Sequence, residues 1–183
     1  GSEMCIRDRD NGEKSTFSEF KDKIPELQSS GMSKMIVDLR DNPGGVLDEA
    51  CNMADMILPE GIITYTETKS GKRTDYNSNA ESLDIPIVIL INENSASASE
   101  VFTGALKDYG KATVVGKKSY GKGIVQSVLP FYDGSGMSLT VAKYYTPNGT
   151  CIHGIGIEPD VEVDMPDEYK DMYASMVEHD KDT

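Results

Sequence analysis

The sequence predicts a mixed α/β fold built as one domain. Segments with helical periodicity alternate with short runs of β-branched and apolar residues, and turn-forming residues separate them. With 183 residues, of which 38% are hydrophobic, the chain is long enough to bury one substantial core. We expect this core at residues 15–164, between an N-terminal segment, 1–14, and an acidic tail, 165–183.

The two ends of the chain are expected to lie outside the core. Residues 1–14 show no periodicity and are interpreted as disordered or artefactual, because the letters MCIRDR resemble translated sequencing-adapter DNA. An artefact here would mean that the natural N-terminal part of the protein is missing. Residues 165–183 are predicted to form a surface helix or a frayed tail.

The first predicted element is an amphipathic helix over residues 16–29. Thr16 and Glu19 have the spacing of a capping box, Pro25 predicts a kink, and Gly31 follows the end of the helix. The apolar positions recur at helical spacing, namely Phe17, Phe20, Ile24 and Leu27.

A buried strand and a second helix are predicted next. The run KMIVDL (34–39) is short and apolar, and DNPGG (41–45) is a turn rich in residues that tolerate unusual φ/ψ angles. The second helix is expected from about 46 to 58 and ends before Pro59. Its inner face carries Leu47, Ala50, Cys51, Ala54, Ile57 and Leu58.

Two hairpins and a strand–helix–strand unit are predicted for the remainder of the core. Residues 62–68 and 72–77 flank a Lys-Ser-Gly turn, and residues 124–131 and 137–145 flank an Asp-Gly-Ser-Gly turn. Between the hairpins, the pattern predicts a strand, a helix and a further strand, at 86–92, 97–108 and 111–116.

Composition argues against several classes of protein. The formal net charge is −13, from 31 acidic and 18 basic side chains, with no basic stripe that could neutralise phosphates, so nucleic acid is not an expected partner. No apolar run approaches the roughly 20 residues that span a bilayer. The cysteines have neither paired nor metal-type spacing, so we expect neither a disulfide framework nor a metal site.

A pattern of alternating serines follows the predicted strand at 86–92. The stretch NSASASE (94–100) places Ser95, Ser97 and Ser99 at the start of a predicted helix. Serine hydroxyls commonly cap the unpaired amides of a first helical turn, which is the structural interpretation. In the functional interpretation, the strand-to-helix turn presents a nucleophile beside amide donors that favour developing negative charge.

A nucleophilic serine needs a base that removes its proton. His179 lies in the acidic tail and His153 in a glycine-rich loop without an orienting acidic residue, so both are interpreted as solvated. Lys122 is the better candidate, because glycines flank it and Ile124 and Val125 follow it. Burial among apolar neighbours would lower the pKa of a lysine from about 10.4 toward roughly 7–8.

Six motifs in this order resemble the C-terminal processing (tail-specific) serine proteases of bacteria and chloroplasts. They are DLRDNPGG, NSASASE, ALKDYGKATVVG, SYGKGIVQ, YYTPNG and GIGIEPDVEV. The resemblance extends from about Thr16 to Val163, and so many ordered motifs make it specific. It implies a mixed ββα spiral fold, the serine protease core that is shared in outline with crotonase-like enzymes.

The resemblance also implies roles for individual residues. The family's Ser–Lys catalytic pair falls on Ser97 and Lys122, and Gln126 falls on the glutamine that orients the lysine in some members. The implied oxyanion hole consists of backbone N–H groups from Ala98 and from Gly44 or Gly45.

Three charged residues are expected to support this site. Asp108 matches an acidic position of many relatives and is interpreted as stabilising the surroundings of the serine helix or a neighbouring loop, with a catalytic role as the alternative. Asp38 and Arg40 are expected to hold the DNPGG turn in shape through hydrogen bonds and an ion pair.

The implied function is that of a serine endopeptidase acting near the C-terminus of unfolded or C-terminally exposed proteins. It would need no metal, coenzyme or other cofactor. The sequence does not decide whether the protein forms a homo-oligomer. Relatives usually work outside the cytoplasm or tethered at a membrane, so the resemblance also implies an N-terminal signal in a missing part of the chain. Two alternatives are a crotonase-like acyl-coenzyme A enzyme and an inactive, peptide-binding fragment of a protease.

Two departures from the family pattern bear on activity. Relatives usually carry a PDZ domain before this region, which captures the substrate's C-terminal residues, and an apolar strand where this chain has RDRDNGEK. The departures predict weak substrate capture and an exposed edge of the core.

Overall fold

Two four-stranded sheets organise the molecule. The computed structural model describes residues 15–79, 82–166, 168–170 and 172, so the predicted segment 1–14 and most of the predicted tail lie outside it. The first sheet is parallel, in the order β1 (Met35–Asp38), β4 (Ile87–Ile91), β5 (Ala112–Gly116) and β8 (Val161–Glu162). The second is antiparallel, in the order β3 (Arg73–Ser78), β2 (Gly61–Thr68), β7 (Gly136–Tyr145) and β6 (Ile124–Pro130).

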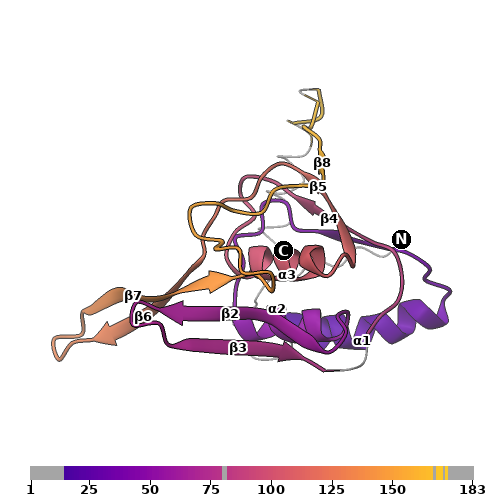
Figure 1. Ribbon diagram of the computed structural model, residues 1–183. Helices are drawn as coiled ribbons and strands as arrows, with labels where there is room; N and C mark the ends of the chain where they lie inside the picture. Colours follow the sequence, from indigo (N-terminus) through magenta and orange to yellow (C-terminus); the bar gives the residue numbers. More distant parts are fainter. Residues whose placement is uncertain (1–14, 80–81, 167, 171, 173–183) are drawn as a thin grey trace.

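Helix α3 (Ala98–Asp108) lies between the two sheets and contacts β5 on one side and β2 on the other (Figure 1). Every residue from Ala98 to Leu106 is buried. Helix α2 (Leu47–Asp55) packs beside α3 against the antiparallel sheet, and α1 (Thr16–Ser29) packs on α2. Because α3 follows β4 after a short turn, its N-terminus is fixed at the carboxyl end of the parallel sheet.

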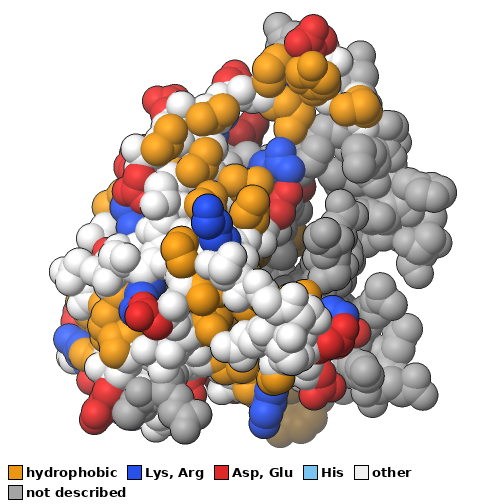
Figure 2. All heavy atoms as spheres, turned by 90° about the vertical axis from the view of Figure 1, so that its right-hand side faces the viewer, with side chains coloured by type: hydrophobic (Ala, Val, Ile, Leu, Met, Phe, Trp, Pro, Cys, Tyr) orange, Lys and Arg blue, Asp and Glu red, His pale blue; other side chains and the backbone are white. Residues whose placement is uncertain are grey.

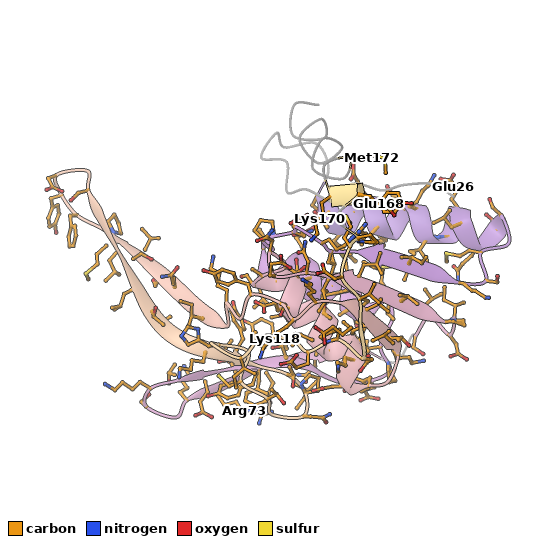
Figure 3. All side chains as sticks on the ribbon, turned by 90° about the horizontal axis from the view of Figure 1, so that it is seen from above. Glu26, Arg73, Lys118, Glu168, Lys170 and Met172 are labelled. Carbon is orange, nitrogen blue, oxygen red and sulfur yellow. The ribbon has the colours of Figure 1, made fainter. Side chains whose placement is uncertain are left out.

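The hairpin of β6 and β7 projects from the rest of the molecule (Figures 1 and 3). We call residues 124–145 the arm. Its base is anchored, because Ala142 and Tyr144 are buried. Farther out it exposes apolar side chains: Val128, Leu129, Phe131, Met137, Leu139 and Val141. On the side of the molecule opposite the arm, acidic and basic side chains are interspersed among apolar ones (Figure 2).

The predicted helices, strands and hairpins of the core are present, with ends that differ by a few residues. The capping prediction for α1 is wrong. The N-cap is Ser15, whose hydroxyl accepts a hydrogen bond from the N–H of Ser18 at 3.2 Å, because Thr16 is already inside the helix. The short strand β8 was not anticipated from the sequence, since two residues carry no usable periodicity.

Candidate active site

Two turns meet at one edge of the parallel sheet, DNPGG after β1 and NSASASE after β4. They meet because β1 and β4 are adjacent and parallel, which places their carboxyl ends together. Asn42 joins the turns twice: its carbonyl oxygen accepts from the N–H of Ala96 at 3.0 Å, and its Oδ1 accepts from the hydroxyl of Ser99 at 3.0 Å. The predicted oxyanion turn is therefore fixed against the predicted nucleophile turn.

Asp41 provides a second connection between these turns. Its backbone has a φ of 57°, and its carboxylate accepts from the side-chain amides of Asn92 at 3.0 Å and Asn94 at 2.6 Å. The buried hydroxyl of Ser95 accepts from the N–H of Asn92 at 3.0 Å and donates to the carbonyl of Leu39 at 2.6 Å. Ser95 thus joins the serine turn to the end of β1.

Ser97 occupies a strained position at the start of α3. Its φ of 59° and ψ of −118° lie in a region that residues with a Cβ rarely adopt, and such strain is found at functional positions that the surrounding structure holds in place. The amides of Ser99 and Glu100 bond to the carbonyls of Ala96 and Ser97, at 3.2 and 2.9 Å. The first turn of the helix is thus supported by backbone acceptors.

The glycine turn approaches the backbone of Ala98 closely. Gly44 has a φ of 84°, and a Cβ built on it would lie 2.6 Å from the nitrogen of Ala98 and 2.5 Å from the oxygen of Ala96, so no larger residue fits. The N–H of Gly44 donates to Asn42 Oδ1 at 2.9 Å. Among the described residues, the N–H groups of Gly45 and Ala98 have no acceptor. Of the predicted oxyanion donors, the N–H of Gly44 is therefore already bonded, whereas those of Gly45 and Ala98 have no acceptor within the described chain.

A buried carboxylate that the sequence reasoning did not assign joins the two halves of the predicted catalytic pair. Glu100 is 1% exposed, and its Oε2 accepts from the N–H of Ser97 and from the N–H of Lys122, each at 2.8 Å. The sequence did contain a signal that Glu100 is buried, because a run of apolar and small residues follows it along a helix that must be buried.

The turn that carries Lys122 also contacts the serine turn directly. The N–H of Tyr120 donates to the carbonyl of Ser95 at 3.0 Å. The expectation that Ile124 and Val125 bury the Lys122 side chain is wrong, since Lys122 is exposed. Both apolar residues belong to β6, which leads outward into the arm. Gln126 is also exposed on β6, and no hydrogen bond joins it to Lys122 within the described chain.

The three supporting residues have structural partners. Asp38 and Arg40 form the expected ion pair, with Nη2 and Oδ2 2.5 Å apart and Nε 2.9 Å from Oδ1. Asp108 accepts from the N–H of Asn148 at 2.8 Å, so it holds the neighbouring turn of the YYTPNG motif. His153 is exposed, and the described residues contain no cluster of acidic, histidine and cysteine side chains suited to a metal ion.

A hollow of about 360 Å³ lies apart from these turns. It is bordered by α2 and β3 and lined by residues that include Asp48, Cys51, Tyr76 and Asn79, with none of the predicted catalytic residues among them. Burial and, to a smaller extent, the charge of Asp48 raise the pKa of Cys51 to about 12, so its thiol is not a reactive nucleophile. No described helix is long and apolar enough to cross a membrane.

The fold and these turns define a mixed α/β core with a strained serine at a strand-to-helix turn. Residues 6–163 match peptidase family S41, and the chain belongs to this family. It is 49% identical over 156 residues to a "Probable CtpA-like serine protease" of Staphylococcus aureus (strain N315), which covers 82% of this chain and 31% of that protein. A protein of the same name from Staphylococcus epidermidis is 46% identical over 156 residues, covering 82% of this chain and 32% of that protein.

Solved structures agree with this assignment. The photosystem II D1 C-terminal processing protease has a TM-score of 0.75 and 37% identity, over 80% of this chain and 38% of its own. A putative S41 protease from Bacteroides fragilis has a TM-score of 0.70 at 20% identity, over 88% of this chain and 46% of its own, and shows the shared fold. The predicted family and its ββα-type core are confirmed. The chain spans about a third of the length of the curated relatives.

Proposed function

We propose that this chain is the catalytic core of a serine endopeptidase with Ser97 as nucleophile and Lys122 as general base. The observation that carries this function is the shared hydrogen bonding of Glu100, whose Oε2 holds the N–H of Ser97 and the N–H of Lys122 at 2.8 Å each. One buried atom thus places the two residues beside each other, although 25 positions separate them in the sequence.

The geometry supports an acyl-transfer mechanism. Neutral Lys122 takes the proton of the Ser97 hydroxyl while the Ser97 oxygen attacks the substrate carbonyl carbon. The N–H groups of Ala98 and Gly45 donate to the resulting oxyanion. The tetrahedral intermediate expels the amine, which receives the proton from Lys122, and water then hydrolyses the ester on Ser97. The strained backbone of Ser97 supports this role, since such strain is found at functional positions, and Ser97 is only half-buried.

The substrates that we propose for the whole protein are unfolded proteins and proteins with an exposed C-terminus, cut near that end. The support is the likeness to a structure named a C-terminal processing protease, at 37% identity. We also propose, from the family resemblance of the sequence motifs, that the whole protein acts outside the cytoplasm. We further propose that the isolated chain is slow, because the side chain of Lys122, the proposed base, is exposed to water.

The test is cleavage of a disordered protein across pH 5–10 by the parent chain and single variants. Ser97→Ala and Lys122→Ala are expected to abolish cleavage, and Lys122→Arg should be equally inactive because a guanidinium stays protonated at any usable pH. His153→Ala serves as the control with an unchanged pH profile. Turnover by Lys122→Arg, or a profile set by His153, would contradict the Ser–Lys mechanism.

The same samples separate the two alternatives. Turnover of acyl-coenzyme A thioesters without peptide cleavage would indicate a crotonase-like enzyme. Peptide binding that is unchanged by Ser97→Ala, with no cleavage and no labelling of the parent by a fluorophosphonate, would indicate an inactive binding fragment. Labelling of Ser97 in the parent chain, and its loss in Lys122→Ala, would support the proposed pair.

A further inference from the structure

The Glu100 carboxylate receives four hydrogen bonds, which uses the acceptor capacity of an ionised carboxylate. Its Oε2 binds the amides of Ser97 and Lys122, as described above. Its Oε1 accepts from the N–H of Gly121 at 2.6 Å and from the hydroxyl of Ser119 at 2.6 Å. Three of the four donors are therefore backbone groups of the catalytic turns. The fourth is the hydroxyl of Ser119, to which no role has been assigned above.

The environment of Ser119 fixes the direction of its hydrogen bond. Ser119 is 7% exposed, and its Oγ accepts from the N–H of Ile157 at 2.7 Å. The hydroxyl proton is then available for Glu100. The backbone strengthens the same contact, because the N–H of Ser119 donates to the carbonyl of Ile157 at 3.1 Å.

The loop that precedes β8 is shaped to hold Ser119 from the other side. Gly156 has a φ of 75°, and a Cβ built on it would lie 2.5 Å from the Ser119 carbonyl oxygen, so the loop approaches the lysine turn as closely as backbone allows. The N–H of Gly154 donates to the carbonyl of Gly121 at 2.9 Å. This close contact gives a physical reason for the glycine at position 156 of the GIGIEP motif.

We propose that Ser119 is a positioning residue for the catalytic pair, which rests on the proposed Ser–Lys function. Its hydroxyl holds the Glu100 carboxylate in the orientation that presents Oε2 to Ser97 and Lys122. Without the hydroxyl, Oε1 keeps one donor, the carboxylate can rotate, and the N–H of Ile157 loses its acceptor in a buried place. Ser119 touches no reacting atom and acts only through Glu100.

The first test needs no catalysis and uses amide hydrogen exchange measured by NMR. Ser119→Ala is expected to speed exchange at the amides of Ser97, Gly121 and Lys122 by about tenfold or more, because their common acceptor is no longer fixed. Ser119→Thr keeps the hydroxyl and should restore slow exchange. Ser78→Ala is the matched control, since Ser78 is buried and its hydroxyl bonds to the carbonyls of Leu58 and Asn79 and to the carboxylate of Asp55, none of which belongs to these turns. Unchanged exchange at all three amides in Ser119→Ala would overturn the inference.

The second test separates this inference from the proposed function. Ser119→Ala should lower kcat about 10- to 100-fold with little change in KM, because a displaced catalytic group slows chemistry and not binding. Ser119→Thr should recover most of this loss, and Ser119→Cys, with a weak donor of similar size, should fall between them. A parent chain that neither cleaves nor labels would contradict the proposed function, while the exchange result would still decide the role of Ser119. Equal kcat in parent and Ser119→Ala would overturn the catalytic part of the inference.

Discussion

The serine side and the lysine side of the candidate site are built differently. The serine turn lies between a parallel sheet and a helix that is buried from Ala98 to Leu106. Its neighbours Asn42, Ser95 and Glu100 have their polar groups bonded within the chain. The lysine turn is fixed through its backbone, but the Lys122 side chain is exposed and the arm that follows it displays apolar residues to solvent. The predicted nucleophile turn is therefore held by hydrogen bonds within this chain, whereas the side chain of the predicted base is exposed to solvent.

This difference shows which side of the site depends more on its surroundings. A nucleophile turn needs only local backbone and a few buried polar groups, all of which this chain contains. A lysine base needs a dry environment as well, because desolvation is what lowers the pKa of an ammonium group. The first prediction below changes the residue that both sides share, and each later one changes a single region, so that the difference can be measured.

The largest effect on activity is expected from Glu100→Gln, because Glu100 connects both sides. An amide at this place keeps one acceptor and turns a donor toward N–H groups, which should cost about 2–4 kcal/mol in the free energy of unfolding and abolish detectable cleavage. The measurements are urea unfolding and the cleavage assay. Glu158→Gln is the control, since Glu158 forms an exposed pair with Lys118 and should change stability by less than about 1 kcal/mol. Equal losses in both variants would show that Glu100 is not the buried link described here.

The next effect compares two glycines with nearly the same backbone. Gly44 in the oxyanion turn has a φ of 84°, and Gly134 in the turn of the arm has a φ of 85°. Alanine at either position should cost about 1–2 kcal/mol for the left-handed backbone. Only Gly44→Ala adds a clash with the backbone of Ala96 and Ala98, since nothing lies within 4 Å of a Cβ at Gly134. Gly44→Ala should thus cost roughly 1–3 kcal/mol more and lose activity, and equal unfolding free energies would refute the close approach.

Much of this architecture could be predicted from the sequence because its signals are local. Apolar periodicity marks α1, α2 and the strands, and the turn letters of DNPGG and NSASASE mark where the chain reverses. The resemblance of the ordered motifs then assigned Ser97 and Lys122 before any geometry was known. The roles of these two residues stay predictions that the proposed assays test.

The rest depended on contacts between distant segments, which no local pattern encodes. The sequence of the helix indicates that Glu100 is buried, but only the fold brings Ser119, Gly121 and Lys122 to it. The exposure of Lys122 could not be read from its apolar neighbours, because whether Ile124 and Val125 cover it depends on the direction in which β6 leaves the body. The sequence could not distinguish Gly44 from Gly45 as an oxyanion donor, because it does not show that the N–H of Gly44 already donates to Asn42 Oδ1.

A smaller effect is expected at high pH, where the base of the arm meets α2. Burial raises the pKa of Tyr144 to about 12, and burial with the charge of Asp48 raises the pKa of Cys51 to about 12. Between about pH 9 and 12 the unfolded chain releases these protons and the folded chain keeps them, so the free energy of unfolding should fall as pH rises through this window. Urea unfolding at pH 8, 9.5 and 10.5 measures it. Cys51→Ala should show a shallower fall above pH 9, and an identical slope would contradict the raised pKa of Cys51.

The smallest effect on stability is expected in the outer arm. Leu139 is 47% exposed on β7, so Leu139→Ser should change the free energy of unfolding by no more than about 0.5 kcal/mol, whereas Ile89→Ala in the fully buried β4 position should cost about 2–5 kcal/mol. The exposed apolar face should instead favour self-association, because contiguous apolar surface of this kind usually marks an interaction site. Sedimentation at rising concentration should show more association for the parent chain than for a Met137→Ser, Leu139→Ser double variant. If Leu139→Ser destabilised the chain as much as Ile89→Ala, the arm would be packed against other residues in solution, and the lysine side would be as complete as the serine side.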